Sequence, residues 1–104
     1  MSTTTIDGRT IHVDQEGFLT EPAEWDEDMA RSLSALLGIE LDERHWKILR
    51  FLRADHASTG ETPTLRRVST SVQVPMKELF QLFPTKPAKK MAYVAGLPKP
   101  RGCV

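Results

Sequence analysis

One side chain in this 104-residue sequence stands out as chemically reactive: Cys103, the only cysteine, one residue before the carboxyl terminus. The thiolate form of cysteine is the nucleophile, and nearby cations favour it. Lys99 and Arg101 place two cations close to this thiol in the sequence. No general base can be identified beside it, so the pattern favours a carrier activated by partner proteins and leaves open whether the chain is itself an enzyme. An incidental exposed cysteine fits the same residues about equally well.

The segment that carries the thiol, residues 96–104, is predicted to be an extended, mobile arm. Prolines at positions 98 and 100 and a glycine at either side, Gly96 and Gly102, exclude a helix or a central strand. At roughly 3.1 Å per residue in a polyproline-like form, the arm carries Cys103 on the order of 20 Å from its root. We expect the arm to hinge at Gly96 and at Gly102.

Several other kinds of chemical motif are absent from the sequence. It has no CxxC pair, no histidine pair with a third ligand and no phosphate-binding glycine loop, so we expect no metal and no cofactor. His45 and His56 stand three helical turns apart, roughly 16 Å, which is too far for one metal ion. There is no long apolar run, no signal-peptide pattern and no second cysteine for an internal disulfide. We therefore expect a cytoplasmic protein that does not enter a membrane.

The charges are divided unevenly along the chain. Residues 1–61 carry thirteen acidic and six basic side chains, whereas residues 62–104 carry eight basic ones and one acidic one, Glu78. Opposed patches of charge orient a protein as it docks to a partner. They also form a folded dipole whose halves compensate each other, and the sequence does not decide between these interpretations. In either case Cys103 belongs to the basic part.

The elements that must position the arm are mostly helices. We predict a mainly α (α+β) fold in one domain, residues 1–104: a hairpin ribbon over 1–20, a small orthogonal helical bundle over 22–95, and the arm over 96–104. Asp7-Gly8 predicts a type I′ turn, preceded by a frayed lead-in over residues 1–5. Helix starts are predicted at Asp26, Asp42, Thr62-Pro63 and Pro75, with a last helix over residues 88–95. Arg66 and Arg67 are expected to point into water.

Residues 64–86 support a different interpretation. They predict a helix, a tight turn and a second helix, and they resemble the helix-turn-helix of TetR-type repressors. The second helix is short and apolar, however, with only Lys77, Glu78 and Gln81 available to read bases. Zero net charge is also atypical of a DNA-binding domain. A DNA-binding regulator, with Cys103 as its thiol sensor, is therefore the alternative function.

The end of the chain carries a family motif. Residues 95–104 read AGLPKPRGCV, and this segment resembles the C-terminal arm of the DsrC/TusE/DsvC sulfur-relay family. Further residues corroborate the likeness: Gly17-Phe18-Leu19, Trp25, His45-Trp46, Phe51-Leu52-Arg53, residues 63–67 and residues 79–89. The resemblance implies a helical domain with an N-terminal hairpin, whose penultimate cysteine, here Cys103, accepts a persulfide and passes the sulfur on. By the same likeness, Lys99 and Arg101 stabilise the thiolate or dock the arm.

Two departures from the family pattern narrow the implied role. The DsrC branch has a second cysteine upstream in the arm, and Ala92 stands at that position here, so this arm cannot close an internal disulfide. The loop that DsrC members carry before the Leu-Phe-x-x-Phe-Pro helix is also missing, since Val74-Pro75 runs directly into that helix. Both departures favour a TusE-like carrier with a single arm cysteine.

The resemblance also implies partners. The upstream partner is a persulfide-donor relay complex of the TusBCD/DsrEFH type. The downstream acceptor is an enzyme like a tRNA thiouridylase, in 2-thiouridine synthesis, with a sulfite reductase or a heterodisulfide-reductase-like complex of sulfur oxidation as second choice. We expect no direct contact with nucleic acid in this role.

Overall fold

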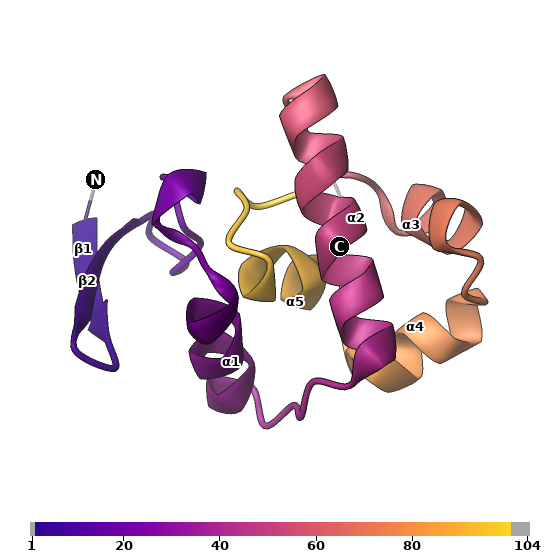
Figure 1. Ribbon diagram of the computed structural model, residues 1–104, viewed down its shortest axis with the longest axis horizontal. Coiled ribbons are helices and arrows are strands. Elements are labelled where there is room, and N and C mark those ends of the chain that lie inside the picture. Colours follow the sequence, from indigo (N-terminus) through magenta and orange to yellow (C-terminus); the bar gives the residue numbers. More distant parts are fainter. Residues whose placement is uncertain (1, 101–104) are drawn as a thin grey trace.

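The computed structural model describes residues 2–100, which form a helical bundle with a β-hairpin at one end (Figure 1). The elements in chain order are β1 (Ser2–Ile6), β2 (Arg9–Val13), the short 3-10 helix η1 (Pro22–Glu24), α1 (Glu27–Leu36), α2 (Glu43–Thr59), α3 (Leu65–Val72), α4 (Met76–Leu82) and α5 (Pro87–Val94). The predicted fold class, mainly helical with an N-terminal hairpin, is confirmed.

The hairpin pairs β1 with β2 in antiparallel register, from Ser2 opposite Val13 to Ile6 opposite Arg9. Asp7 and Gly8 both have positive φ, at 49° and 80°, as a type I′ turn requires. The frayed lead-in that we expected over residues 1–5 is wrong for residues 2–5, which lie in β1. Pairing with β2 satisfies their backbone groups, and a run of threonines suits a strand.

Helix starts follow the capping residues. The Asp26 side chain accepts a hydrogen bond from the Met29 amide, and Asp42 forms a capping box with His45. The expected start of the third helix at Thr62-Pro63 is wrong by two residues. Thr64 is the N-cap, because its hydroxyl accepts a hydrogen bond from the Arg67 amide at 3.2 Å.

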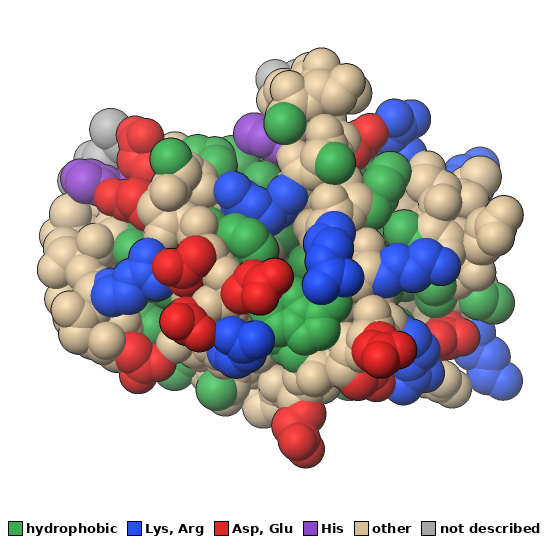
Figure 2. All heavy atoms as spheres, in the orientation of Figure 1, with side chains coloured by type: hydrophobic (Ala, Val, Ile, Leu, Met, Phe, Trp, Pro, Cys, Tyr) green, Lys and Arg blue, Asp and Glu red, His purple; other side chains and the backbone are tan. Residues whose placement is uncertain are grey.

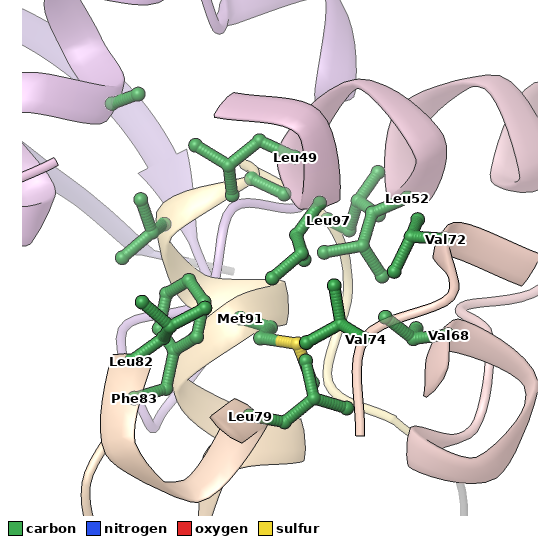
Figure 3. Close-up of a cluster of buried hydrophobic side chains, with 14 residues drawn as sticks. Leu49, Leu52, Val68, Val72, Val74, Leu79, Leu82, Phe83, Met91 and Leu97 are labelled. Carbon is green, nitrogen blue, oxygen red and sulfur yellow. The ribbon is translucent and has the colours of Figure 1, made fainter. Parts of the chain in front are cut away.

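The main hydrophobic core lies around α2, with α5 packed between α1 and α2 (Figure 1). Leu49 and Leu52 of α2 are fully buried there. Figure 3 shows that Leu97, which follows α5, lies among these leucines and Met91. The first residues of the predicted arm are therefore part of the core.

Candidate functional site

Cys103, the residue with the strongest chemical prediction, lies outside the described residues, as do Arg101 and Gly102. The structure describes the arm up to Pro100. What it shows of the site is therefore how residues 96–100 lie against the helical bundle, and which surface surrounds Pro100.

The arm begins with a tight turn at the end of α5. Gly96 has a φ of +70°, a conformation that favours glycine. The Gly96 amide donates to the Tyr93 carbonyl at 3.2 Å, and the Leu97 amide donates to the Ala92 carbonyl at 3.0 Å. A Cβ atom at Gly96 would lie only 2.4 Å from Cδ1 of Trp25. Both the backbone angle and the lack of space therefore require glycine at this position.

Trp25 and Arg53 hold this turn from two sides. The Trp25 indole Nε1 donates to the Val94 carbonyl at 2.8 Å, and the Arg53 guanidinium lies 4.1 Å from the centre of the indole ring. Arg53 also donates to the Ala95 carbonyl at 2.8 Å and to the Pro22 carbonyl at 3.0 Å. Burial lowers the pKa of Arg53 from its usual range. One side chain thus ties the chain before α1 to the end of α5.

The next arm residues also lie on the bundle. Leu97 is 1% exposed within the core. The Thr62 hydroxyl donates to the Pro98 carbonyl at 3.0 Å, and Pro100 is buried. A hinge motion at Gly96 would withdraw Leu97 from the core, so these contacts favour a fixed root there rather than the pivot that we expected.

Lys99, predicted to dock the arm or to stabilise the thiolate, forms an ion pair with Glu16 of the turn after β2. Both side chains are roughly half exposed, and ion pairs of this kind contribute little to stability. The contact nevertheless gives the arm a second attachment, on the hairpin side of the molecule.

A cleft of about 580 Å³ opens beside Pro100. Its lining comes from the end of α2, the α2–α3 connection and the starts of α3, α4 and α5: Asp55, Thr59, Glu61, Thr62, Pro63, Thr64, Leu65, Arg66, Arg67, Met76, Ala88 and Pro100. The described part of the arm therefore ends at the rim of a largely preformed hollow, which is the kind of surface where partners and ligands bind.

One ion pair shapes this cleft. Arg67 donates to both carboxylate oxygens of Asp55, at 3.0 and 2.6 Å. The guanidinium holds the pKa of Asp55 below its usual value, and the carboxylate raises the pKa of Arg67. Arg67 is exposed, as expected, and its guanidinium also reaches a buried carboxylate of α2, a contact that the sequence did not predict.

The helix pair α3–α4 is present as predicted, joined through Gln73 in the left-handed conformation. The outer face of α4 carries two exposed apolar side chains, Met76 and Phe80. A helix that reads DNA presents polar and charged side chains to the base edges. The DNA-binding alternative is therefore not favoured.

Two further findings concern residues 2–100. In that range no three His, Cys, Asp or Glu side chains are grouped so that they could hold a metal ion. Within the same residues no helix has both the length and the apolar character needed to cross a membrane.

Sequence reasoning missed three parts of this site: the bridge made by Arg53, the pair Asp55–Arg67, and the bond from Thr62 to the arm. Their partners are 12 to 42 residues away, and such contacts leave no periodic signal. The family likeness pointed toward Trp25 and Arg53 as residues, but not toward these contacts.

Comparison with known proteins confirms the resemblance drawn from the arm. A family model described as "DsrC like protein" matches residues 5–104. Sulfurtransferase TusE of Salmonella paratyphi A is 35% identical over 106 residues, covering 95% of this chain and 97% of the relative.

Solved structures of similar proteins support the same family. The NMR structure of Allochromatium vinosum DsrC has a TM-score of 0.83 at 35% identity, covering 98% of this chain and 97% of that one. The oxidized gamma-subunit of the dissimilatory sulfite reductase (DsrC) from Archaeoglobus fulgidus has a TM-score of 0.81 at 36% identity, covering 99% and 100%. With its arm motif, its fold and these similarities, the chain belongs to the DsrC-like family.

Proposed function

We propose that this protein is a single-thiol sulfur carrier that uses Cys103. The Cys103 thiolate attacks the outer sulfur of a donor persulfide, the donor's S–S bond breaks, and the donor leaves as a thiolate. Cys103 then holds the persulfide until an acceptor thiolate attacks its outer sulfur in the same way. Each step exchanges one S–S bond for another, so no external oxidant or reductant is needed. The similarity to sulfurtransferase TusE supports this role.

The anchored arm is the observation that carries the proposal. Trp25 and Arg53 hold the end of α5 through the carbonyls of Val94 and Ala95, and Thr62 binds the carbonyl of Pro98, so the described part of the arm ends at a defined place beside the cleft. Three residues of chain span at most about 11 Å, which limits how far Cys103 can lie from Pro100. A carrier benefits from a thiol that is presented at a constant position, because partners then find it in the same orientation.

We assign roles to the remaining arm residues within this proposal. Lys99 docks the arm through Glu16, Arg101 supplies the cation that favours the thiolate, and Gly102 is the pivot beside the thiol. Gly96 is the fixed root. Ala92, fully buried in α5, offers no second thiol, so the arm carries sulfur without an internal disulfide switch.

The single arm cysteine favours a TusE-like place in the relay, in a reducing cytoplasm. The proposed donor is a complex of the TusBCD/DsrEFH type, and the proposed acceptor is an enzyme like a tRNA thiouridylase. A sulfite reductase is a second choice, since the A. fulgidus structure is described as a gamma-subunit of that enzyme.

Intact mass spectrometry tests the proposal. The full chain is incubated with inorganic polysulfide, and a gain of one sulfur atom, about 32 Da, is expected on the wild type. Cys103→Ala should gain nothing, and Lys99→Ala should still load. A wild type that gains no sulfur, but binds duplex DNA tightly and in a salt-dependent way, would instead establish the regulator.

A further inference from the structure

The outer face of α4 carries an apolar surface that the fold does not use. Met76 is 41% exposed and Phe80 is 49% exposed, whereas Leu79 and Leu82 on the inner face are buried. Met76 and Phe80 are one helical turn apart, so their side chains are neighbours on one face. We call these two side chains the α4 patch. It is the feature of the helix pair that neither folding nor DNA binding explains.

The α4 patch is continuous with the cleft. Met76 lines the cleft together with Leu65 and Pro63, and Pro100 of the arm lines it as well. An apolar surface therefore runs from α4 into the hollow at whose rim the described chain ends. Contiguous apolar surface that is exposed beside a cleft is a candidate site of protein contact.

The charged side chains around this surface are mixed, and two exposed cations stand among them. Arg66 lines the cleft and is exposed, and exposed Lys77 stands next to Met76. The carboxylates of Asp55 and Glu78 are already engaged by arginines, while Glu61 lines the cleft from the α2–α3 connection. Figure 2 shows the wider pattern: acidic side chains gather over the hairpin and α1, and basic ones are more frequent over the helices on the other side.

We infer that the α4 patch and the adjoining cleft dock the protein that hands sulfur to Cys103, and that this protein presents an apolar surface rimmed by Asp and Glu. The inference rests on the proposed carrier function. Cys103 follows Pro100 by three residues, so a donor whose sulfur touches it must come within about 11 Å of the cleft rim. We expect a protein that approaches so closely to cover Met76 of the cleft lining and its neighbour Phe80, and burial of these two side chains would stabilise the complex.

Two matched substitutions test this surface. Phe80→Asp places a charge in the α4 patch, and Leu36→Asp places the same charge on α1, where Leu36 is 63% exposed outside the cleft lining. Both positions are exposed, so both variants should fold, which circular dichroism checks. Phe80→Leu keeps an apolar side chain and should behave like the wild type. The probe is the purified persulfide-donor complex of the TusBCD/DsrEFH type from the organism that encodes this chain.

Binding is measured in a Cys103→Ala background, so that its outcome does not depend on sulfur chemistry. Phe80→Asp should weaken binding to the immobilised complex at least about tenfold, while Leu36→Asp stays within about twofold of the parent. Arg66→Glu should weaken binding and reduce its salt dependence. Equal effects of Phe80→Asp and Leu36→Asp, or no binding of the parent chain, would overturn the inference.

Sulfur transfer separates this inference from the proposed function. With Cys103 restored, Phe80→Asp should slow loading from the donor complex and leave loading from inorganic polysulfide unchanged. If polysulfide loading slows equally, the cleft acts on the arm itself and the inference is wrong. If the wild type sediments as a dimer that Phe80→Asp separates, a second copy occupies the patch and the inference is also wrong. Failure of the wild type to load from either source refutes the carrier, whereas the binding result still decides the docking surface.

Discussion

Substitution of Gly96 by alanine examines the fixed root of the arm directly. The added Cβ would lie 2.4 to 2.7 Å from three atoms of Trp25, where real Cβ atoms do not approach closer than about 3.0 Å. Trp25 cannot turn aside without loss, because its indole donates to Val94 and stacks on Arg53. The backbone cannot move freely either, since Leu97 beside it is buried in the core.

The expected loss of stability has two parts. Alanine at a φ of +70° costs about 1 kcal/mol in the left-handed region. Overpacking against a held aromatic ring adds about 2–3 kcal/mol. Gly38 offers a matched control, because its φ is +73° and a Cβ there would meet nothing within 4 Å. Gly38→Ala therefore carries the backbone part alone, and the difference between the variants measures the contact with Trp25.

Thermal and urea unfolding followed by circular dichroism supply the measurement. For a domain of this size 1 kcal/mol corresponds to a change in Tm of about 4–8 °C, so Gly96→Ala should melt roughly 10 °C below Gly38→Ala. Hydrogen exchange of the Leu97 amide, which donates to Ala92, should accelerate in Gly96→Ala only. Equal melting temperatures for the two variants would refute the packing of the arm root on Trp25.

Three further predictions concern the contacts around the arm. Arg53→Met should lower the free energy of unfolding by about 2–3 kcal/mol in urea titrations, because it removes charged hydrogen bonds to buried carbonyls such as that of Ala95. An unchanged free energy of unfolding would contradict the role of Arg53 in joining the end of α5 to the rest of the fold. Arg67 lowers the pKa of Asp55, so their ion pair stabilises the fold above about pH 5 and loses this effect as the pH falls. The urea midpoint of Asp55→Asn should therefore fall less than that of the wild type between about pH 5 and pH 2.5. Parallel curves for the two proteins would contradict this role of the ion pair. Lys99→Ala should cost less than about 1 kcal/mol by the same titration, because its ion pair is half exposed, and a larger loss would mean that the arm is held there.

The fold was largely predictable because its signals are local. Asp7-Gly8 encodes the hairpin turn, and Asp26 and Asp42 encode helix starts through hydrogen bonds to residues within one turn. The misplaced start of the third helix shows the limit of such reasoning. Thr62 and Thr64 are equally good caps in sequence. In the structure, however, the Thr62 hydroxyl donates a hydrogen bond to the carbonyl of Pro98, 36 residues away.

The arm shows a different limit. Its prolines and glycines predict an extended segment, and composition cannot tell an extended segment that is free from one that is attached. Leu97 is the single apolar residue between Gly96 and Pro98, too little to register as a core position by periodicity. Its burial depends on Trp25 and Arg53, whose approach to the end of α5 only the tertiary structure brings about.

In the proposed carrier, attachment of the arm as far as Pro100 shortens the reach of Cys103. A free arm rooted at Gly96 would carry Cys103 on the order of 20 Å toward a distant partner, whereas an arm held as far as Pro100 lets Cys103 reach about 11 Å from that residue at most. In the proposed relay the partner would then have to come to the domain, and we expect part of the binding energy to arise from the surface around the cleft rather than from the arm alone. Release of Leu97 from the core would restore the longer reach, and the loss of its buried apolar surface costs about 2 kcal/mol. A partner with a deep active site would have to offset this free energy by its own contacts with the arm. Loading of Gly96→Ala compares the two modes: if its weakened root speeds transfer to a deep acceptor but not loading from polysulfide, release of the arm limits that transfer.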